Sequence, residues 1–326
     1  MKNKLHIVLT IILVIIIGIL SITISKNNKE NDSLNRIKVA EVTHSAFYTP
    51  FYVAIENGYF KENNIDIDLI LTSGANNVIA AVLSGDVQIG FCGPEATIYV
   101  YNEGEKDYIR TFAGLTKRDG QFIVSRKKYD NFSLKDLINK EVIAGRAGGM
   151  PILNFYTALK NENIKDVKVN DTVDFANLTS AFIGGSGDFV NLFEPNATKL
   201  EKMGFGYVVA SIGKYSGEVP YTAFNAKKSF IENNKDLINR FRLSINKGLE
   251  YTLNNDSATI AKSIINLFPD TSLSDLELII ERYKEADSWL TNTEIKEDLF
   301  INLENMLIDG KLIKEYVPYN DLIIND

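Results

Sequence analysis

Residues 83–96 read LSGDVQIGFCGPEA, and this order of apolar, small and helix-breaking residues decides the fold. Gly85 ends a predicted helix, because glycine readily adopts the left-handed conformation found at helix ends. The run Val87–Phe91 then predicts a buried strand. Pro94 follows, and proline is favoured in the first turn of a helix, where its missing N–H would have no intrahelical partner. The stretch therefore predicts a strand that turns a sharp corner into a helix over 94–102.

The same alternation of strands and helices continues on both sides of this stretch. Short β-type runs that alternate with helical runs are typical of a mostly parallel sheet covered by helices, so the predicted fold class is α/β. In the first half, the predicted strands are Ile37–Val42, Ile65–Leu71, Val87–Phe91, Thr111–Leu115 and Phe122–Ser125. A second unit starts near Leu134, and a strand over 221–227 returns the chain to the first unit. The apolar period predicts helices over 230–253, 255–267, 273–292 and 293–308.

Strand-to-helix corners carry the candidate ligand contacts. Four of the seven prolines, Pro50, Pro94, Pro151 and Pro195, lie at the predicted first turn of a helix. In an open α/β sheet these corners lie at the carboxyl ends of strands, where ligands bind and helix N-termini offer free N–H groups. Glycines let a backbone approach a ligand, aromatic rings offer flat walls, and Arg or Glu supplies charge. The candidates beside the four prolines are His44, Phe47, Tyr48, Cys92, Gly93, Glu95, Arg146, Gly148, Gly149 and Glu194.

Some of these candidates also have a structural interpretation, which the sequence leaves open. Cys92 is the only cysteine of the chain, and a lone cysteine is commonly just a small buried residue. His44 fits either a ligand contact or a loop hydrogen bond. Glu194 fits either a ligand contact or a partner for the positive end of the helix that follows it.

Residues 58–70, GYFKENNIDIDLI, and 83–96 resemble the opening of the nitrate-, sulfonate-, taurine- and thiamine-precursor-binding proteins of ABC importers. GRAGGMP at 145–151 and the segments 174–195 and 206–224 are similar to further parts of that family. The resemblance runs from about Arg36 to about Leu253 and implies a type II periplasmic-binding-protein fold, in which two α/β lobes enclose a ligand cleft.

The lobes are expected to alternate along the chain, because this fold joins them by two crossings. Lobe 1 is predicted to comprise residues 36–123 and 221–326, including the C-terminal helices. Lobe 2 is predicted to comprise residues 124–220.

The resemblance also implies a function and a ligand. It implies a monomeric receptor that delivers a small molecule to permease and ATPase subunits, with no catalysis, cofactor or metal. FVNLFEP at 189–195 resembles the thiamine-pyrimidine binders, in which an acidic residue at the position of Glu194 contacts the pyrimidine. A carboxyl group can pair with the amino group and ring nitrogen of an aminopyrimidine. An anionic solute, such as a sulfonate, taurine or nitrate, would instead favour Arg146 and the Gly148–Gly149 backbone. Asp174, Asn177 and Tyr221 complete the candidate set.

Other function classes are disfavoured. The net charge is −7 and no basic stripe is present, so nucleic acid is not an expected partner. No Ser-His-Asp spacing, metal-ligand cluster or nucleotide fingerprint is present, which argues against an enzyme. A related fungal pyrimidine synthase depends on a cysteine-rich motif that one cysteine cannot reproduce. A sensory ligand-binding domain stays open as an alternative.

The first residues differ from the rest in composition. Lys2 and Lys4 precede an apolar run, which predicts a membrane anchor or signal segment over 1–24. No cleavage site of the Ala-x-Ala type and no lipid-accepting cysteine follows the run, so an uncleaved anchor is the prediction. Residues 25–35 are polar and read as a linker. The globular part is expected at the extracytoplasmic face of the cell membrane.

Overall fold

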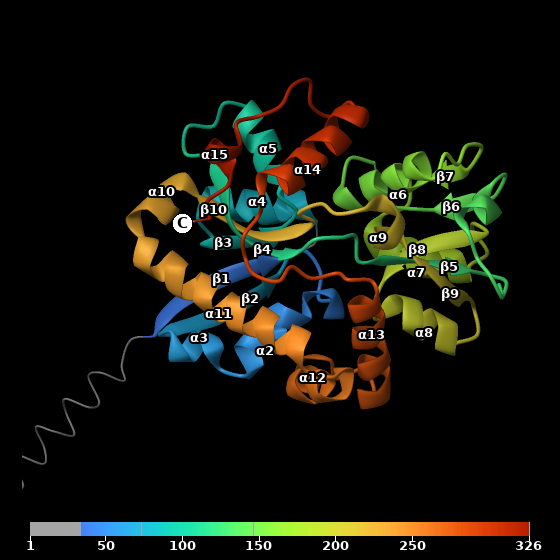
Figure 1. Ribbon diagram of the computed structural model, residues 1–326, viewed down its shortest axis with the longest axis horizontal. Helices are drawn as coiled ribbons and strands as arrows, with labels where there is room; N and C mark the ends of the chain where they lie inside the picture. The colour runs from blue at the N-terminus through green and yellow to red at the C-terminus, as the bar shows by residue number, and fades with distance from the viewer. Residues whose placement is uncertain (1–33, 73, 146, 326) are drawn as a thin grey trace, which may run out of the picture.

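Two separate five-stranded sheets, each with its own helices, form the molecule (Figure 1). The computed structural model describes residues 34–72, 74–145 and 147–325. The predicted anchor over 1–24 and nearly all of the linker over 25–35 lie outside these ranges. Within them, no helix is long and apolar enough to cross a membrane.

Sheet A takes four strands from residues 35–116 and a fifth from residues 222–227. Its strand order is β2-β1-β3-β10-β4. Strand β1 pairs in parallel with β2 and β3, whereas β10 is antiparallel to both of its neighbours. The prediction that residues 221–227 return the chain to the first unit is therefore confirmed. The strands of sheet A are β1 (Asn35–Glu41), β2 (Ile65–Leu71), β3 (Ile89–Cys92), β4 (Ile109–Thr116) and β10 (Thr222–Lys227).

Sheet B is built from the middle of the chain, in the order β7-β6-β8-β5-β9. Strand β5 is antiparallel to β8 from Gln121 to Ser125. The predicted boundary between residues 123 and 124 is therefore placed too late, because it falls inside a strand that belongs wholly to sheet B. The strands of sheet B are β5 (Gln121–Ser125), β6 (Glu141–Ile143), β7 (Lys168–Asn170), β8 (Phe189–Phe193) and β9 (Tyr207–Ser211). Below, lobe 1 means sheet A with its helices and lobe 2 means sheet B with its helices.

All four prolines that the sequence singles out open helices. Pro50 and Pro151 lie in the first turns of α2 and α6, and Pro94 and Pro195 are the N-caps of α5 and α8. The helices around sheet A are α2 (Thr49–Glu56), α3 (Tyr59–Glu62), α4 (Ala75–Ser84), α5 (Glu95–Asn102), α10 (Lys228–Asn233), α11 (Lys235–Asn254), α12 (Ser257–Ile264), α14 (Glu297–Asp309) and α15 (Tyr319–Leu322). Those around sheet B are α6 (Met150–Asn161), α7 (Leu178–Ile183), α8 (Asn196–Lys202) and α9 (Ile212–Ser216), and α13 (Leu273–Glu285) lies between the lobes. The 3-10 helices are η1 (Ala46–Tyr48), η2 (Leu134–Leu137), η3 (Phe175–Asn177) and η4 (Ile265–Leu267).

The two helices predicted over 273–292 and 293–308 are both present, but the segment between them corrects their bounds to Leu273–Glu285 and Glu297–Asp309. Helix α13 ends at Glu285, and Asp287 has a positive φ of 52°. The chain then runs extended beside the end of β4, where Lys117 N donates to Ser288 O at 2.9 Å and Leu290 N donates to Leu115 O at 3.0 Å. These bonds satisfy backbone groups at the point where the chain passes from sheet A to sheet B, which a continued helix could not do.

Candidate functional site

The strand-to-helix corners of lobe 1 face those of lobe 2. Ser45 Oγ, before α2, donates a hydrogen bond to Glu194 O, before α8, at 2.6 Å. The Tyr99 hydroxyl on α5 lies 3.4 Å from Gly148 O, before α6. At the same corner, a Cβ added to Gly93 would lie 2.9 Å from Met150 Cγ. The helix N-termini singled out by the four prolines therefore meet in pairs across the gap between the lobes.

Five buried side chains gather where these corners meet the chain crossings, and we call them the interlobe cluster. They are Tyr48, Cys92, Glu95, Asp119 and Tyr221. Burial raises the pKa of the Tyr221 hydroxyl and of the Cys92 thiol, and the charges of Asp119 and Glu95 raise the first further, as Glu95 does the second. Ring contacts agree with this grouping, because Tyr48 packs on Phe91, next to Cys92, with ring centroids 4.5 Å apart, and its neighbour Phe47 packs on Tyr221 at 5.6 Å.

The two crossing segments hold Asp119 and Tyr221 in place. Asp119 Oδ1 accepts a hydrogen bond from Gln121 N at 2.5 Å, and Tyr221 N donates to Thr116 O at 3.1 Å. Between Asp119 and Gln121, a Cβ on Gly120 would lie 2.5 Å from the Phe47 ring. Only glycine allows the crossing to pass this close to lobe 1.

The cluster holds several polar atoms that have no hydrogen-bond partner although they are buried. Burial raises the pKa of the Asp119 carboxyl, and the nearby Tyr221 hydroxyl opposes part of that rise. The two groups nevertheless make no hydrogen bond of good geometry. Buried polar groups almost always have a partner, so a group of unpaired ones indicates a missing ligand or water. The unpaired atoms in and beside the cluster are Glu95 Oε2, Asp119 Oδ2, Tyr221 Oη, Gln121 Oε1, and Oδ1 and Nδ2 of Asn191.

Burial dominates the electrostatics of the two carboxyl groups. Loss of solvent raises the pKa of Glu95 to about 7, although hydrogen bonds from the backbone of Glu95 and Ala96 act in the opposite direction. Loss of solvent likewise raises the pKa of Asp119 to about 8. Both groups therefore hold a proton in the unliganded molecule at mildly acidic pH.

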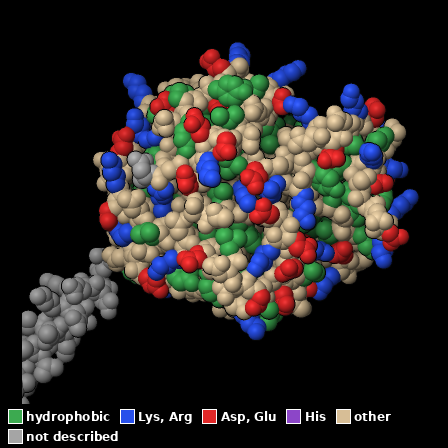
Figure 2. Space-filling model, in the orientation of Figure 1, with side chains coloured by type: hydrophobic (Ala, Val, Ile, Leu, Met, Phe, Trp, Pro, Cys, Tyr) green, Lys and Arg blue, Asp and Glu red, His purple; other side chains and the backbone are tan. Residues whose placement is uncertain are grey.

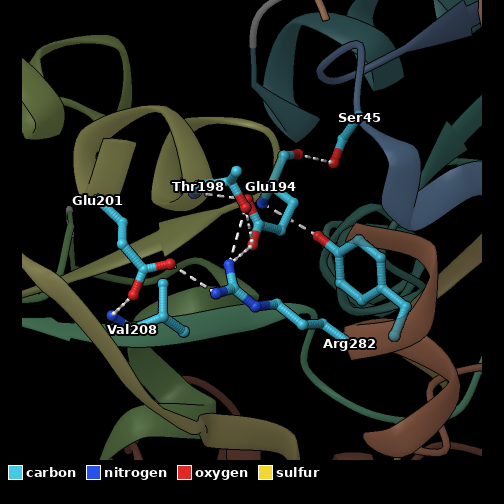
Figure 3. Close-up of polar contacts among 7 residues, drawn as sticks. Ser45, Glu194, Thr198, Glu201, Val208 and Arg282 are labelled. Atoms are coloured by element: carbon cyan, nitrogen blue, oxygen red, sulfur yellow. Dashed lines mark hydrogen bonds and ion pairs between the residues drawn. The ribbon is translucent and has the colours of Figure 1, made fainter. Parts of the chain in front are cut away.

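Glu194 is engaged by the protein itself (Figure 3). Its buried carboxylate accepts hydrogen bonds from Thr198 N at 2.8 Å and Thr198 Oγ1 at 2.9 Å, and it pairs with Arg282 Nη1 at 2.8 Å. Arg282, on α13, also reaches Glu201 Oε2 at 2.6 Å, while Glu194 N donates a hydrogen bond to the hydroxyl of Tyr283, the neighbour of Arg282, at 3.1 Å. This geometry gives Glu194 the role of fastening α8 to α13. Ligand contact by Glu194 stays a prediction.

His44 is fastened in a comparable way inside lobe 1. Its Nδ1 lies 2.9 Å from Glu41 Oε1 and its Nε2 lies 2.9 Å from Leu267 O. The ring also packs beside Tyr52 and Phe268. The hydrogen bond and charge of Glu41 raise the pKa of His44 above its ordinary value of 6.5, against the opposing effect of burial. The structure thus gives His44 the loop hydrogen bond that the sequence left open as an alternative.

This arrangement predicts a pH-dependent contribution of His44 to stability. Because the folded pKa is raised, the contribution is fully present below pH 6.5 and is lost as the pH rises through the folded pKa. We expect the free energy of unfolding of wild type to exceed that of His44→Phe by more at low pH than at high pH. The change in this excess should be on the order of 1 kcal/mol, since partial exposure weakens the pair. Urea unfolding from pH 5 to 9 measures the difference. Tyr52→Phe is the control, because it removes a bond to Glu41 at 2.6 Å without removing a group that titrates in this range.

The remaining candidates lie in different surroundings. Phe47 is buried against Phe193 of lobe 2 and Tyr221, with ring centroids 5.6 Å away in both cases. Gly148 has a positive φ of 89° and Gly149 is the N-cap of α6. Asp174 and Asn177 are exposed around η3. Arg146 lies outside the described residues. For all of these residues, ligand contact stays a prediction.

Sequence reasoning missed Asp119, Gln121 and Asn191. Asp119 and Gln121 precede a short strand and look like ordinary turn and surface residues, and Asn191 interrupts the apolar run of β8. One signal was available, since a polar residue inside an otherwise buried strand needs a partner.

Comparison with known proteins agrees with this architecture. A family model described as NMT1/THI5 like matches residues 46–259. The chain belongs to this family. A Bacillus subtilis (strain 168) relative, named "Putative binding protein YtlA", is 38% identical over 298 residues, which cover 90% of this chain and 89% of the relative.

Solved structures share the fold of this NMT1/THI5-like chain. The alkanesulfonate-binding protein SsuA from Xanthomonas axonopodis pv. citri, bound to MOPS, has a TM-score of 0.69 at 12% identity and covers 90% of this chain and 99% of its own. The periplasmic aliphatic sulphonate-binding protein SsuA from Escherichia coli has a TM-score of 0.68 at 13% identity, with coverage of 88% and 96%. The predicted two-lobed periplasmic-binding-protein fold is confirmed.

The described residues offer no alternative metal chemistry. Among residues 34–72, 74–145 and 147–325, no group of three or more His, Cys, Asp or Glu side chains could hold a metal ion. The interlobe cluster is the candidate functional site because corners of both lobes and unpaired buried polar atoms meet there.

Proposed function

We propose that this NMT1/THI5-like chain is the extracytoplasmic solute-binding protein of an ABC importer, and that it binds a small molecule between its lobes. One observation carries the proposal: among the described residues, six of the twelve buried side-chain polar atoms without a partner belong to Glu95, Asp119, Gln121, Asn191 and Tyr221, at or beside the junction of the two lobes. The relative named as a binding protein and the shared fold of two sulfonate-binding proteins support it. The partners would be permease and ATPase subunits.

Closure of the lobes would be the working step. Glu95 and Tyr48 belong to lobe 1, Gln121 and Asn191 belong to lobe 2, and Asp119 and Tyr221 lie on the crossings. A ligand that contacts all three regions stabilises the closed arrangement by its differential affinity for that state. The face shown in Figure 2 carries interspersed acidic and basic side chains, which supports a small-molecule ligand over nucleic acid. Under this proposal the chain is not an enzyme and acts as a monomer, and the segment 1–24 tethers it to the membrane.

Our first choice of ligand is a thiamine-precursor pyrimidine, with an aliphatic sulfonate, taurine or nitrate as the alternative. The carboxyl and aromatic groups of the interlobe cluster and the resemblance of residues 189–195 to the thiamine-pyrimidine binders support the pyrimidine. The two solved structures that share the fold are of sulfonate-binding proteins, which supports the sulfonate.

A thermal-shift panel on the purified full-length chain tests the function. The panel holds 4-amino-5-hydroxymethyl-2-methylpyrimidine, thiamine, taurine, ethanesulfonate, nitrate and a small-molecule extract of bacterial cells. A bound solute at about 100 times its Kd adds about 2.7 kcal/mol to the free energy of unfolding, so we expect a clear rise in Tm. The proposal fails if neither the pure compounds nor the extract raises the Tm.

A further inference from the structure

We infer that the solute presents a protonated or N–H-bearing nitrogen group to Asp119 and Glu95, so the interlobe cluster selects an amine-type ligand and rejects anions. This inference rests on the proposed function, because it names the chemical class of the ligand at the same site. It moves the recognition role from Glu194, which the sequence favoured, to two carboxyl groups with free oxygens.

The first argument is the pattern of missing partners. Glu95 and Asp119 are 3% and 0% exposed, and each leaves one carboxyl oxygen without a hydrogen bond. Beside them, Tyr221 Oη and Gln121 Oε1 are also unpaired. Each of these atoms can accept a hydrogen bond once the carboxyl groups are ionised, and among the unpaired atoms beside the cluster only Asn191 Nδ2 can act as a donor alone. A ligand that donates N–H bonds satisfies such a set, whereas an anion offers further acceptors.

The second argument is charge balance. Within the described ranges, no Lys or Arg side chain contributes to the environment of either carboxyl. Arg118, next to Asp119 in the chain, pairs with Glu218 at 3.0 Å, and Arg282 pairs with Glu194 and Glu201. An anion at these two carboxyl groups would therefore be buried beside groups that are either neutral or negatively charged, at a high cost in desolvation.

The other titratable groups around the cluster add no positive charge. Tyr48 and Cys92 face Glu95 and are neutral, because burial raises the pKa of both. Glu41 also acts on Tyr48, and its carboxylate is shared between His44 and the Tyr52 hydroxyl. A protonated His44 is thus already paired with Glu41.

The third argument concerns the helix N-termini, which would be the natural places for an anion. The N-terminus of α5 is occupied by Glu95, whose carboxyl receives hydrogen bonds from the backbone of Glu95 and Ala96. The N-terminus of α8 is occupied by Glu194, which accepts from Thr198 N. Two of the four helix ends at the corners therefore hold carboxyl groups of the chain itself, which removes them as sites for a sulfonate or nitrate.

The test uses two matched ligands and one matched pair of variants. Isothermal titration of the full-length chain compares 4-amino-5-hydroxymethyl-2-methylpyrimidine with its 4-oxo analogue, in which a carbonyl replaces the amino group, and with ethanesulfonate and nitrate. In parallel, the protein is loaded with the cell extract and washed, and the molecules released on denaturation are identified by mass spectrometry. Asp119→Asn and Glu95→Gln keep the shape of the site. Asp107→Asn is the control, since Asp107 precedes β4 and its carboxylate accepts hydrogen bonds from Ser229 of α10.

We expect the released molecule to carry a protonatable nitrogen. Its affinity, or that of the aminopyrimidine, should fall by roughly tenfold to a hundredfold in Asp119→Asn and stay unchanged in Asp107→Asn. Release of an acidic molecule without such a nitrogen, or binding of ethanesulfonate that survives Asp119→Asn, overturns the inference and leaves the solute-binding function standing. If no molecule is retained and no compound binds, the proposed function fails as well.

Discussion

Arg282→Met is expected to lower the free energy of unfolding by about 3 kcal/mol, because it leaves the Glu194 carboxylate buried without its counter-charge. The Glu194 side chain is 0% exposed and the Arg282 side chain 17% exposed, with 2.8 Å between Oε1 and Nη1. Breaking a buried pair costs about 3–5 kcal/mol, and the partial exposure of Arg282 puts the effect at the lower end of that range. Arg282 also loses its bonds to Thr198 and Glu201, so α13 is released from α8.

Urea unfolding monitored by fluorescence measures this loss. The chain has one tryptophan, Trp289, which is 2% exposed and donates to Phe47 O at 2.8 Å, so its emission reports the packing between α13 and η1. Lys247→Met is the matched control, because it removes a cation from an exposed pair with Glu62, where the loss should be much smaller than for Arg282→Met. Adding Glu194→Gln to Arg282→Met should recover part of the stability, since no buried charge is then left unpaired.

The same variants decide the role of Glu194. If Glu194 fastens α8 to α13, Glu194→Gln lowers stability and leaves solute affinity close to that of wild type. An equal loss for Arg282→Met and Lys247→Met would contradict the fastening role. A loss of affinity in Glu194→Gln as large as in Asp119→Asn would return Glu194 to the ligand site.

Much of the fold could be predicted, because its signals are local. The run Val87–Phe91 with Gly85 and Pro94 specifies a strand and its corner from neighbouring residues alone, and all four prolines open helices as expected. The return of β10 to sheet A also followed from alternation. The extended segment after α13 was missed, because its hydrogen bonds go to residues 114–117, far away in the sequence.

The site was harder to predict, because its properties arise from contacts across the lobes. The Glu194 position matched a family pattern, but its partner Arg282 lies 88 residues further along and looks like a solvated residue of an amphipathic helix. Asp119 looks like a turn residue, and only burial by both lobes makes it distinctive. Sequence patterns thus indicated which corners form the site, while the structure shows which carboxyl groups still lack a partner.

Asp119→Asn is expected to be more stable than wild type when no solute is bound and the pH is above about 5. The difference should grow until about pH 8. The folded pKa of Asp119 is raised from 3.8 to about 8 by burial. A raised folded pKa contributes stability that is fully present below the unfolded pKa and is lost as the pH rises through the folded pKa. The loss therefore develops between pH 4 and pH 8. At about 1.36 kcal/mol per pH unit, it reaches up to about 5 kcal/mol, and asparagine does not suffer it.

Urea unfolding of both proteins from pH 4 to 9 measures this difference, which should favour Asp119→Asn increasingly above pH 5. Asp107→Asn is a control of opposite sign, because hydrogen bonds from Ser229 and the charges of Lys227 and Lys228 lower the pKa of Asp107 despite some burial. Its contribution is present above the unfolded pKa of 3.8 and is lost as the pH falls through the folded value. A difference between wild type and Asp119→Asn that does not change with pH would show that Asp119 is solvated in the free protein.

Adding the solute extends this experiment to the charge of the ligand. An amine-type ligand stabilises the ionised Asp119 carboxylate, so it lowers the pKa of that group and should flatten the pH dependence of wild type. An anion would act in the opposite direction and steepen it, because it raises the cost of ionising the same buried carboxyl. The sign of the change in slope therefore reports the charge of the bound molecule even before that molecule is identified.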